Sequence, residues 1–436
     1  MFQQYSNFIQ SRSFKQWIHM IGVAGLFFFA FGMLSKKSFA HAGIAMMALS
    51  FGFTLKDCWR EAFRDRLFAL SAAFFLFLLL RTFLAAMEFN AHVPQLVEGA
   101  LKLFGTGFLL VYMVAFWLHR VRGKWDLVLI VLMAGFLVQI LRNIEWGSLK
   151  AMLDIFQTGT QRATFGFATN RLGLFSALLL LACLLLYKPT WGSPESGWAW
   201  YLARIAFWAL MSCMSAVCLI YSQSRSAWLA AILVIPATLA FKVFWSSGLK
   251  LRRLAPVLLV AMVIGAGIFL SNASNIFKQR LAPGIDAPSV SSRMSLYEIA
   301  WDNWKEHPFL GRGPGTSRLM IQQAGEEYNE LKVLDHLHNV LFDTAAQIGI
   351  VGVTFVGFSW FLIIRQVFRS KFFNNETFDK VYALFALGAL AMMLITGMVN
   401  QPFHSPHGVY IVGYLGGICY SFKFAEDSGQ NRMPLS

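Results

Sequence analysis

Long apolar segments recur along the whole chain of 436 residues, and they constrain its fold more than any other feature. A helix needs about 20 mostly apolar residues to cross the hydrocarbon core of a bilayer. Twelve segments approach or exceed this length, and we expect each to form a membrane-spanning helix. They cover residues 16–34, 39–55, 66–87, 97–118, 125–143, 171–187, 199–221, 226–245, 254–271, 338–366, 378–400 and 406–424. The chain is therefore predicted to be an all-α polytopic membrane protein with about 12 transmembrane helices.

The composition excludes the main classes of water-soluble protein. Hydrophobic residues make up 57% of the chain and charged residues only 14%, whereas a soluble domain has about 25% charged residues. No two of the five cysteines share an extramembrane loop. A soluble enzyme, a disordered chain and a disulfide-rich secreted domain are thus excluded.

The positions of lysine and arginine predict the orientation of the chain in the membrane. Cytoplasmic loops are enriched in these residues, and the formal net charge is +15. With the N-terminus in the cytoplasm, the basic clusters at 56–66, 120–124, 250–253 and 365–371 all fall inside. The pair at 36–37 falls outside and is treated as an exception. Both termini are predicted to be cytoplasmic.

One loop is long enough to form a small domain of its own. Residues 272–337 fall on the outer side and contain a helical stretch at 293–301 together with Pro/Gly turns. We therefore divide the chain into transmembrane helices 1–9 (1–271), the loop domain (272–337), transmembrane helices 10–12 (338–424) and a cytoplasmic tail (425–436). Recognition or catalysis outside the membrane should involve the loop domain.

A serine–arginine motif lies in a tight outer turn between two predicted spans. Ser224 is expected to cap the following helix, which places Arg225 at the first position of that helix. The helix dipole at this end favours anions over cations. Arg225 is therefore best explained by a phosphate bound between its guanidinium and the helix end. An interfacial arginine that reaches lipid headgroups is the alternative.

A second arginine, Arg293, follows the serine pair Ser291 and Ser292 in the loop domain. We expect the serines to open a helix, with Arg293 in its first turn. Taken by itself, this motif is better explained by a solvated arginine than by a binding site.

Two histidines lie at the start of the tenth predicted span, in Asp335-His336-Leu337-His338-Asn339. Asp335 is expected to cap that helix, which places His338 about one turn into it at the outer membrane surface. Histidines two residues apart point to opposite sides of a helix, so this pair is poorly placed to share a metal. No metal-binding motif occurs, and no metal is predicted. A single imidazole suits a general base, because its unperturbed pKa is about 6.5.

The segment Gly311-Arg312-Gly313-Pro314-Gly315 superficially resembles a phosphate-binding loop. It lacks the preceding strand and the closing Lys-Ser/Thr pair that such a loop requires. We interpret it as a turn that shapes the loop domain against the membrane.

Taken in order, these landmarks resemble the O-antigen ligase and polymerase family of bacterial membrane glycosyltransferases. The resemblance covers mainly residues 220–355. Its pieces are Ser224 to Leu229, the long outer loop, the stretch from Arg293 through His307 and Gly311 to Gly313, the pair His338 and Asn339, and Gln347 to Gly352. More loosely, the stretch from Arg162 to Asn170 resembles the polar segment that precedes a span in this family.

Within the family, O-antigen ligase is the closest fit. The resemblance implies transfer of an O-antigen glycan from undecaprenyl diphosphate to a sugar hydroxyl of the lipid A-core, at the periplasmic face of the bacterial inner membrane. It also implies the helical architecture called GT-C, an inverting reaction, and no metal or other cofactor. The expected partners are the lipid-linked donor, the lipid A-core acceptor and membrane lipids, but not nucleic acid.

The resemblance also implies roles for individual residues. Arg225 and Arg293 would bind the diphosphate, whose negative charge grows as the glycosidic bond breaks. His338 would take the proton from the attacking hydroxyl. Possible substrate-binding residues are Arg162, Asn170, Ser224, His336 and Asn339.

Three other functions remain open at this point. An O-antigen or capsule polymerase and a protein O-glycan transferase would use the same donor, and both would need a base and a diphosphate clamp. A twelve-span secondary transporter commonly has two related halves and helices broken at mid-membrane. No such half-to-half similarity is visible in the sequence.

Overall fold

The computed structural model describes residues 12–105, 108–121, 124–144, 164–186, 198–247, 288–334, 336–369, 377–399 and 406–430. Within these residues the regular structure is helical, and there is no β-strand. Nine of the described helices are long and apolar enough to cross a membrane. The prediction of an α-helical polytopic membrane protein is therefore confirmed.

Most predicted spans coincide with single helices. These helices are α2 (Arg12–Leu34), α3 (Lys37–Arg64), α4 (Arg66–Glu88), α7 (Trp125–Arg142), α9 (Thr169–Leu186), α10 (Trp198–Tyr221), α11 (Arg225–Ser247), α16 (Val340–Arg369) and α17 (Thr377–Gly397). The last predicted span falls in α18 (Pro406–Gln430), which is not among the nine. The predicted span 254–271 lies outside the described residues.

The predicted single span at 97–118 falls in two helices rather than one. The short helix η1 (Asn90–His92) is followed by two separate helices, α5 (Val93–Gly105) and α6 (Phe108–Arg120). α5 packs along α4, whereas α6 packs along α18. A Cβ atom added to Gly99 of α5 would lie 2.2 Å from the Cα atom of Gly315. The N-terminal part of this apolar run thus packs backbone to backbone against the loop domain.

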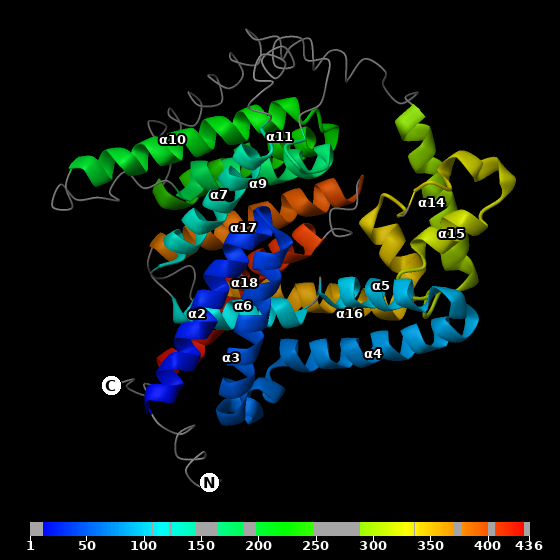
Figure 1. Ribbon diagram of the computed structural model, residues 1–436, viewed down its shortest axis with the longest axis horizontal. Coiled ribbons are helices and arrows are strands. Elements are labelled where there is room, and N and C mark those ends of the chain that lie inside the picture. The colour runs from blue at the N-terminus through cyan, green and yellow to red at the C-terminus, as the bar shows by residue number, and fades with distance from the viewer. Residues whose placement is uncertain are drawn as a thin grey trace.

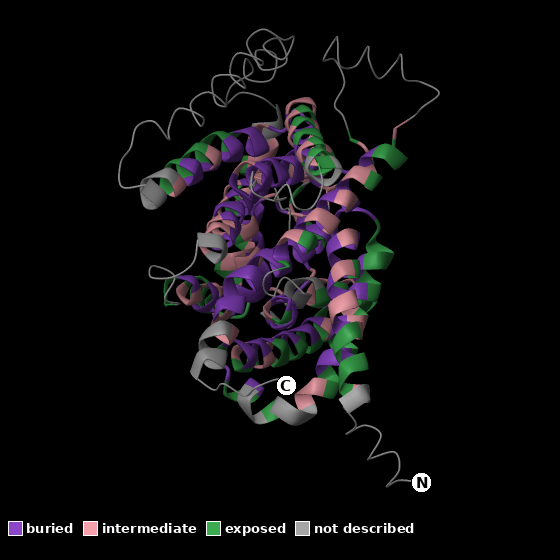
Figure 2. Ribbon diagram, turned by 90° about the vertical axis from the view of Figure 1, so that its left-hand side faces the viewer, coloured by how far each residue is buried: buried purple, intermediate pink, exposed green. Residues whose placement is uncertain are grey.

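α18 lies at the centre of the bundle (Figure 1). It packs against α6, α16 and α17, and every residue from His407 to Phe422 is buried. α4 and α16 run side by side on one flank of the bundle, while α9, α10 and α11 form another group. Figure 2 shows that buried residues are concentrated in the middle of the molecule. The burial of α18 on all sides fits a central rather than a lipid-facing helix.

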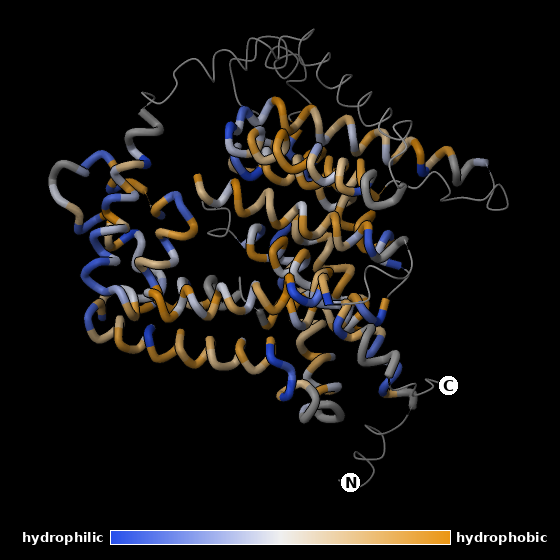
Figure 3. The backbone as a smooth tube through the Cα atoms, turned by 180° about the vertical axis from the view of Figure 1, so that it is seen from behind, coloured by the Kyte–Doolittle hydropathy of each residue, from blue (hydrophilic) through white to orange (hydrophobic). Residues whose placement is uncertain are grey.

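Large apolar side chains cover the outside of the bundle. On α4, Leu76 and Phe83 are each 65% exposed, and Figure 3 shows hydrophobic residues along the lengths of the helices. An apolar surface of this extent would be unfavourable in water, but it is the expected surface of a helix that faces lipid.

The described part of the loop domain is a small helical unit. It comprises α14 (Pro288–Glu306), α15 (Ser317–Gln323) and η6 (Glu326–Leu331), which pack around Leu296, Ile299 and Ile321. In Figure 1 it lies at the right-hand edge, at the ends of α4, α5 and α16. The predicted helical stretch at 293–301 is confirmed as part of α14.

The glycine-rich segment of the loop domain inserts its backbone into a break in α16. The break is at Gly349, where φ is 62°. The backbone N–H groups of Arg312 and Gly313 donate to the carbonyls of Ala346 and Gln347, each at 2.8 Å. Irregular backbone within a membrane helix is tolerated only if its polar groups are satisfied within the protein. The segment is therefore a structural turn, as predicted.

A buried arginine fixes this turn from the opposite side. Arg81 of α4 is 8% exposed, and its Nε and Nη2 atoms donate to the carbonyl oxygen of Gly311 at 3.1 and 2.6 Å. The turn is thus held between α4 and α16, which fixes the position of the loop domain at the ends of these helices.

Gly349→Ala is expected to destabilise the protein by more than about 2 kcal/mol. An alanine Cβ would lie 2.3 Å from the carbonyl oxygen of Phe309, at a φ that L residues rarely adopt. Gly357→Ala is the matched control, because that glycine is on the same helix with nothing within 4 Å of an added Cβ. Thermal unfolding in detergent should show a lower midpoint for Gly349→Ala alone. Equal midpoints would contradict the packing described above.

Candidate active site

Arg225 is the first residue of α11, and the turn before it consists of buried polar residues. Ser224 caps the helix as predicted, since its Oγ accepts a hydrogen bond from the backbone N–H of Ala227 at 3.5 Å. Ser222, Gln223 and Ser224 are all buried, and Ser222 Oγ accepts from the Ser224 N–H at 3.3 Å. The start of α11 is therefore held by contacts within the protein rather than by lipid.

The start of α9 lies beside this turn. A Cβ atom added to Gly173 would be 2.6 Å from Ser222 Oγ, so the two segments are in direct contact. Asn170, half-buried, lies in the first turn of the same helix. The structure thus brings Asn170 and Ser224 to one region of the bundle. Arg162 lies outside the described residues.

Arg293 lies in the second turn of α14, so its predicted place in the first turn is wrong. The helix begins at Pro288, before the serine pair. Proline is favoured as the first residue of a helix because the N–H that it lacks would have no helical partner there.

The two arginines lie close to each other. Burial lowers the pKa of the Arg293 guanidinium, Tyr297 raises this pKa, and the positive charge of Arg225 lowers it. A charge has such an effect only over a short distance. α11 and α14, which the sequence separates by 40 residues, therefore bring their cationic groups together.

A pair of guanidinium groups in this arrangement is suited to bind an anion. Two neighbouring cations repel each other, and partial burial weakens their hydration. A phosphate group relieves both effects, because a planar guanidinium can donate two parallel hydrogen bonds to its oxygens. Within the described residues, no group of three or more His, Cys, Asp or Glu side chains is placed to hold a metal ion.

α16 begins at Val340, and its cap is Asn339. The Oδ1 atom of Asn339 accepts a hydrogen bond from the backbone N–H of Leu341 at 2.9 Å. Asp335, the expected cap, lies outside the described residues. His338 therefore precedes the helix, and the prediction that it lies one turn inside is wrong.

The rings of His336 and His338 lie against each other, with their centroids 4.2 Å apart. The expected opposite orientation is thus wrong, because neither residue is in a helix. Both residues are half-buried, and the Nδ1 atom of His338 is inaccessible to solvent. The ring of His338 is therefore confined by its surroundings.

Backbone strain is concentrated near these residues. Among the described residues, only Phe165, Gln223 and His338 combine a side chain with a positive φ, and φ is 54° at His338. Such conformations cost about 1–3 kcal/mol each and are commonly found at active sites. Gln223 is two residues from Arg225, so two of the three strained positions coincide with the motifs identified in the sequence.

One carbonyl group joins the arginine region to the histidine region. The oxygen of Met398, just beyond the end of α17, accepts hydrogen bonds from Tyr297 Oη at 3.1 Å and from Asn339 Nδ2 at 2.9 Å. Tyr297 is one turn after Arg293, and Asn339 follows His338. The structure therefore brings Arg225, Arg293 and His338 to one end of the bundle.

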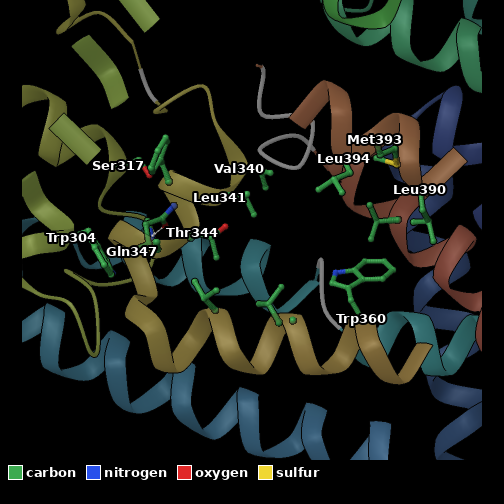
Figure 4. Close-up of a pocket in the computed structure, with 18 of the residues that line it drawn as sticks. Trp304, Ser317, Val340, Leu341, Thr344, Gln347, Trp360, Leu390, Met393 and Leu394 are labelled. Carbon is green, nitrogen blue, oxygen red and sulfur yellow. Dashed lines mark hydrogen bonds between the residues drawn. The ribbon is translucent and has the colours of Figure 1, made fainter. Parts of the chain in front are cut away.

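A cavity of about 1120 Å³ opens beside this cluster, and its wall includes Val340 and Leu341 at the start of α16 (Figure 4). Its two ends differ in chemistry. The apolar lobe lies between α16 and α17 and includes Val353, Val356, Trp360, Ile364 and Leu390. The polar lobe lies between α5, α14 and α15 and includes Gln95, Glu98, Trp301, Trp304, Ser317 and Arg318.

Sequence reasoning missed the polar lobe. Its residues come from α5 and, much later in the chain, from α14 and α15, and none of them forms a motif. One local signal was available: Trp301 and Trp304 are three residues apart and therefore share a face of a polar helix. Figure 4 shows Trp304 and Ser317 at this end of the cavity, and Trp360 and Leu390 at the other.

Comparison with known proteins identifies the segment that contains these residues. Residues 209–357 match the family model described as O-antigen ligase. The match includes Arg225, Arg293 and His338, together with the described part of the loop domain. No curated protein matches the chain. The resemblance found in the sequence is thus confirmed over residues 209–357, where the chain matches the O-antigen ligase family model.

Proposed function

We propose that this protein is an O-antigen ligase in the strict sense. It transfers an O-antigen polysaccharide from undecaprenyl diphosphate to a sugar hydroxyl of the lipid A-core, in the last step of lipopolysaccharide assembly. The reaction takes place at the periplasmic face of the bacterial inner membrane, with both termini of the chain in the cytoplasm. The family match supports ligase or polymerase chemistry, and the site geometry supports the mechanism below.

Arg225 and Arg293 bind the diphosphate of the donor. As the bond between the anomeric carbon and the diphosphate oxygen breaks, its electron pair stays on that oxygen and the negative charge of the leaving group grows. Guanidinium groups held in position before the reaction stabilise this charge without reorganisation. The proximity of the two groups across α11 and α14 supports this role.

His338 acts as the general base. The acceptor hydroxyl attacks the anomeric carbon on the face opposite the diphosphate, which inverts the configuration, and its proton passes to the imidazole. Because Nδ1 of His338 is inaccessible to solvent, we assign the proton to Nε2. Strain at this residue supports the role, since a left-handed backbone fixes the ring direction at an energetic cost.

The apolar lobe accommodates the polyprenyl chain of the donor. A lipid whose diphosphate lies at the water–membrane boundary must extend its chain along apolar protein or lipid surface. The apolar lobe starts next to Val340 and continues along α16 to Ile364, so it offers such a path from the histidine into the bundle.

The single observation that carries the proposal is that the positive charge of Arg225 acts on the Arg293 guanidinium, within the family-matched segment that also contains His338. No general feature of a polytopic membrane protein requires two cations to approach one another at the membrane boundary, whereas such a pair would stabilise a diphosphate leaving group.

The lipopolysaccharide of a strain that lacks the gene tests the proposal. A ligase deletion should leave core-only lipopolysaccharide and long polymer on undecaprenyl diphosphate, and the wild-type gene should restore the ladder of capped molecules. Lipopolysaccharide capped with only one O-antigen repeat unit would instead identify a polymerase. If the deletion strain kept its normal lipopolysaccharide ladder but no longer attached the glycan to a protein, the chain would be a protein O-glycan transferase.

A further inference from the structure

Trp301 and Trp304 form an aromatic pair on the wall of the polar lobe. Their ring centroids are 4.9 Å apart, and the ring planes are tilted by 38°. Both residues line the cavity, and Trp301 is 46% exposed. The buried face of α14 is formed by other residues, among them Leu296, Ile299 and Ala300. The small core of the loop domain is therefore built without this pair.

The pair also lies on the same face of α14 as Arg293. Trp304 is 11 residues after Arg293, which is about three helical turns or 16 Å along the axis. Tyr297 lies between them on this face, one turn after Arg293. The face of α14 thus leads from the proposed diphosphate site to the aromatic pair.

Ordinary packing does not account for Trp304. Its Nε1 atom is shielded from solvent and has no hydrogen-bond partner among the described residues. A buried donor without a partner costs about 1–3 kcal/mol, and an indole N–H usually finds a partner when it is buried. A ligand that enters the lobe and contacts Trp304 can supply the missing acceptor.

The surroundings of the pair differ from those of an interfacial tryptophan belt. Belt tryptophans direct their rings toward lipid headgroups. Trp301 and Trp304 instead share the wall of a cavity with Gln95, Glu98 and Arg318. This combination of aromatic faces with amide, carboxylate and guanidinium groups suits a ligand that presents both C–H faces and hydroxyls, as a pyranose does.

We propose that Trp301 and Trp304 form a sugar-binding subsite for the glycan of the lipid-linked donor. A pyranose ring stacks on the indoles through its C–H groups, and its hydroxyls bond to polar groups of the same lobe. The assignment to the donor rests on the proposed function and on the shape of the cavity. Its two lobes are continuous, so one molecule with an apolar chain and a glycan can occupy both.

Binding of two lipids to the full-length protein, measured without acceptor, tests this subsite. The probes are undecaprenyl diphosphate with its glycan and bare undecaprenyl diphosphate. Trp301→Ala and Trp304→Ala should each weaken binding of the glycosylated lipid by about tenfold, whereas binding of the bare lipid should stay unchanged. Trp304→Phe should weaken binding of the glycosylated lipid less than Trp304→Ala does, because an aromatic ring remains while the N–H donor is lost.

Trp17→Ala is the matched control, because Trp17 is 62% exposed and lies near the other end of the molecule on α2. Its binding of both lipids should equal that of the wild type. Equal loss for both lipids in the Trp301 or Trp304 variants would overturn the sugar subsite, as would no loss for either. If the Trp301 and Trp304 variants instead raised only the KM for the lipid A-core, the subsite could not be assigned to the donor. Failure of the wild type to bind either lipid would instead contradict the proposed function.

Discussion

Replacing His338 with alanine is expected to lower the rate of glycan transfer by about 10²–10⁴-fold, the range that a general base contributes. The acceptor hydroxyl would then have to attack without giving up its proton to the protein. Binding of the donor should change little, because the diphosphate is held by the arginines. Single-turnover transfer with purified donor and acceptor measures the rate, and equilibrium binding of the donor measures the affinity.

Two further variants separate catalysis from folding. His338→Asn also removes the imidazole, but asparagine tolerates a left-handed backbone better than most residues do. This variant should therefore unfold at or near the wild-type temperature and still be inactive. His92→Ala removes an exposed histidine in η1, at the same end of α4 as the loop domain, and it should be fully active. Near-normal turnover by His338→Ala would rule out His338 as the base.

The membrane helices could be predicted from the sequence because each apolar run is long enough to decide its own structure. The run at 97–118 shows the limit of this approach. Its composition resembles that of the other spans, yet its N-terminal part lies in α5, where Gly99 is in backbone contact with Gly315 of the loop domain. A contact between residues so far apart in the chain leaves no local signature, so hydropathy alone could not reveal it.

The position of His338 shows the same limit at a finer scale. Asp335 and Asn339 are both good helix caps, and local preference does not separate them. The structure uses Asn339, whose amide group caps α16 through Oδ1 and also binds the carbonyl of Met398 through Nδ2. A carboxylate cannot donate this second hydrogen bond. The tertiary contact with the end of α17 therefore favours the later cap and leaves His338 outside the helix.

The arginine motifs were easier to recognise than the cavity. Arg225 is unusual for a local reason, since it is a cation at a helix N-terminus, and the sequence contains that information. The cavity depends on how α5, α14, α15, α16 and α17 pack together. No single segment carries a pattern that predicts its volume or its division into two lobes.

Arg225→Lys and Arg293→Lys are each expected to lower transfer by about 10- to 100-fold, although the formal charge is unchanged. Lysine carries a compact charge on a flexible stem, whereas arginine offers a planar fork that matches two phosphate oxygens. If the growing charge on the diphosphate is stabilised by this fork, the loss should be larger in the rate of the chemical step than in donor affinity. Arg204→Lys is the control, because Arg204 is exposed on α10, and it should be fully active.

The stability of the ligand-free protein provides a second test of the clamp. Two neighbouring guanidinium groups repel each other when no anion lies between them, so Arg225→Ala should not lower the unfolding temperature of the ligand-free protein. The wild type should gain stability when bare undecaprenyl diphosphate is added, since a ligand that binds only the folded state stabilises it. Arg225→Ala should gain much less. If both lysine variants kept full activity and Arg225→Ala responded to the lipid as the wild type does, the two arginines could not be the groups that hold the diphosphate.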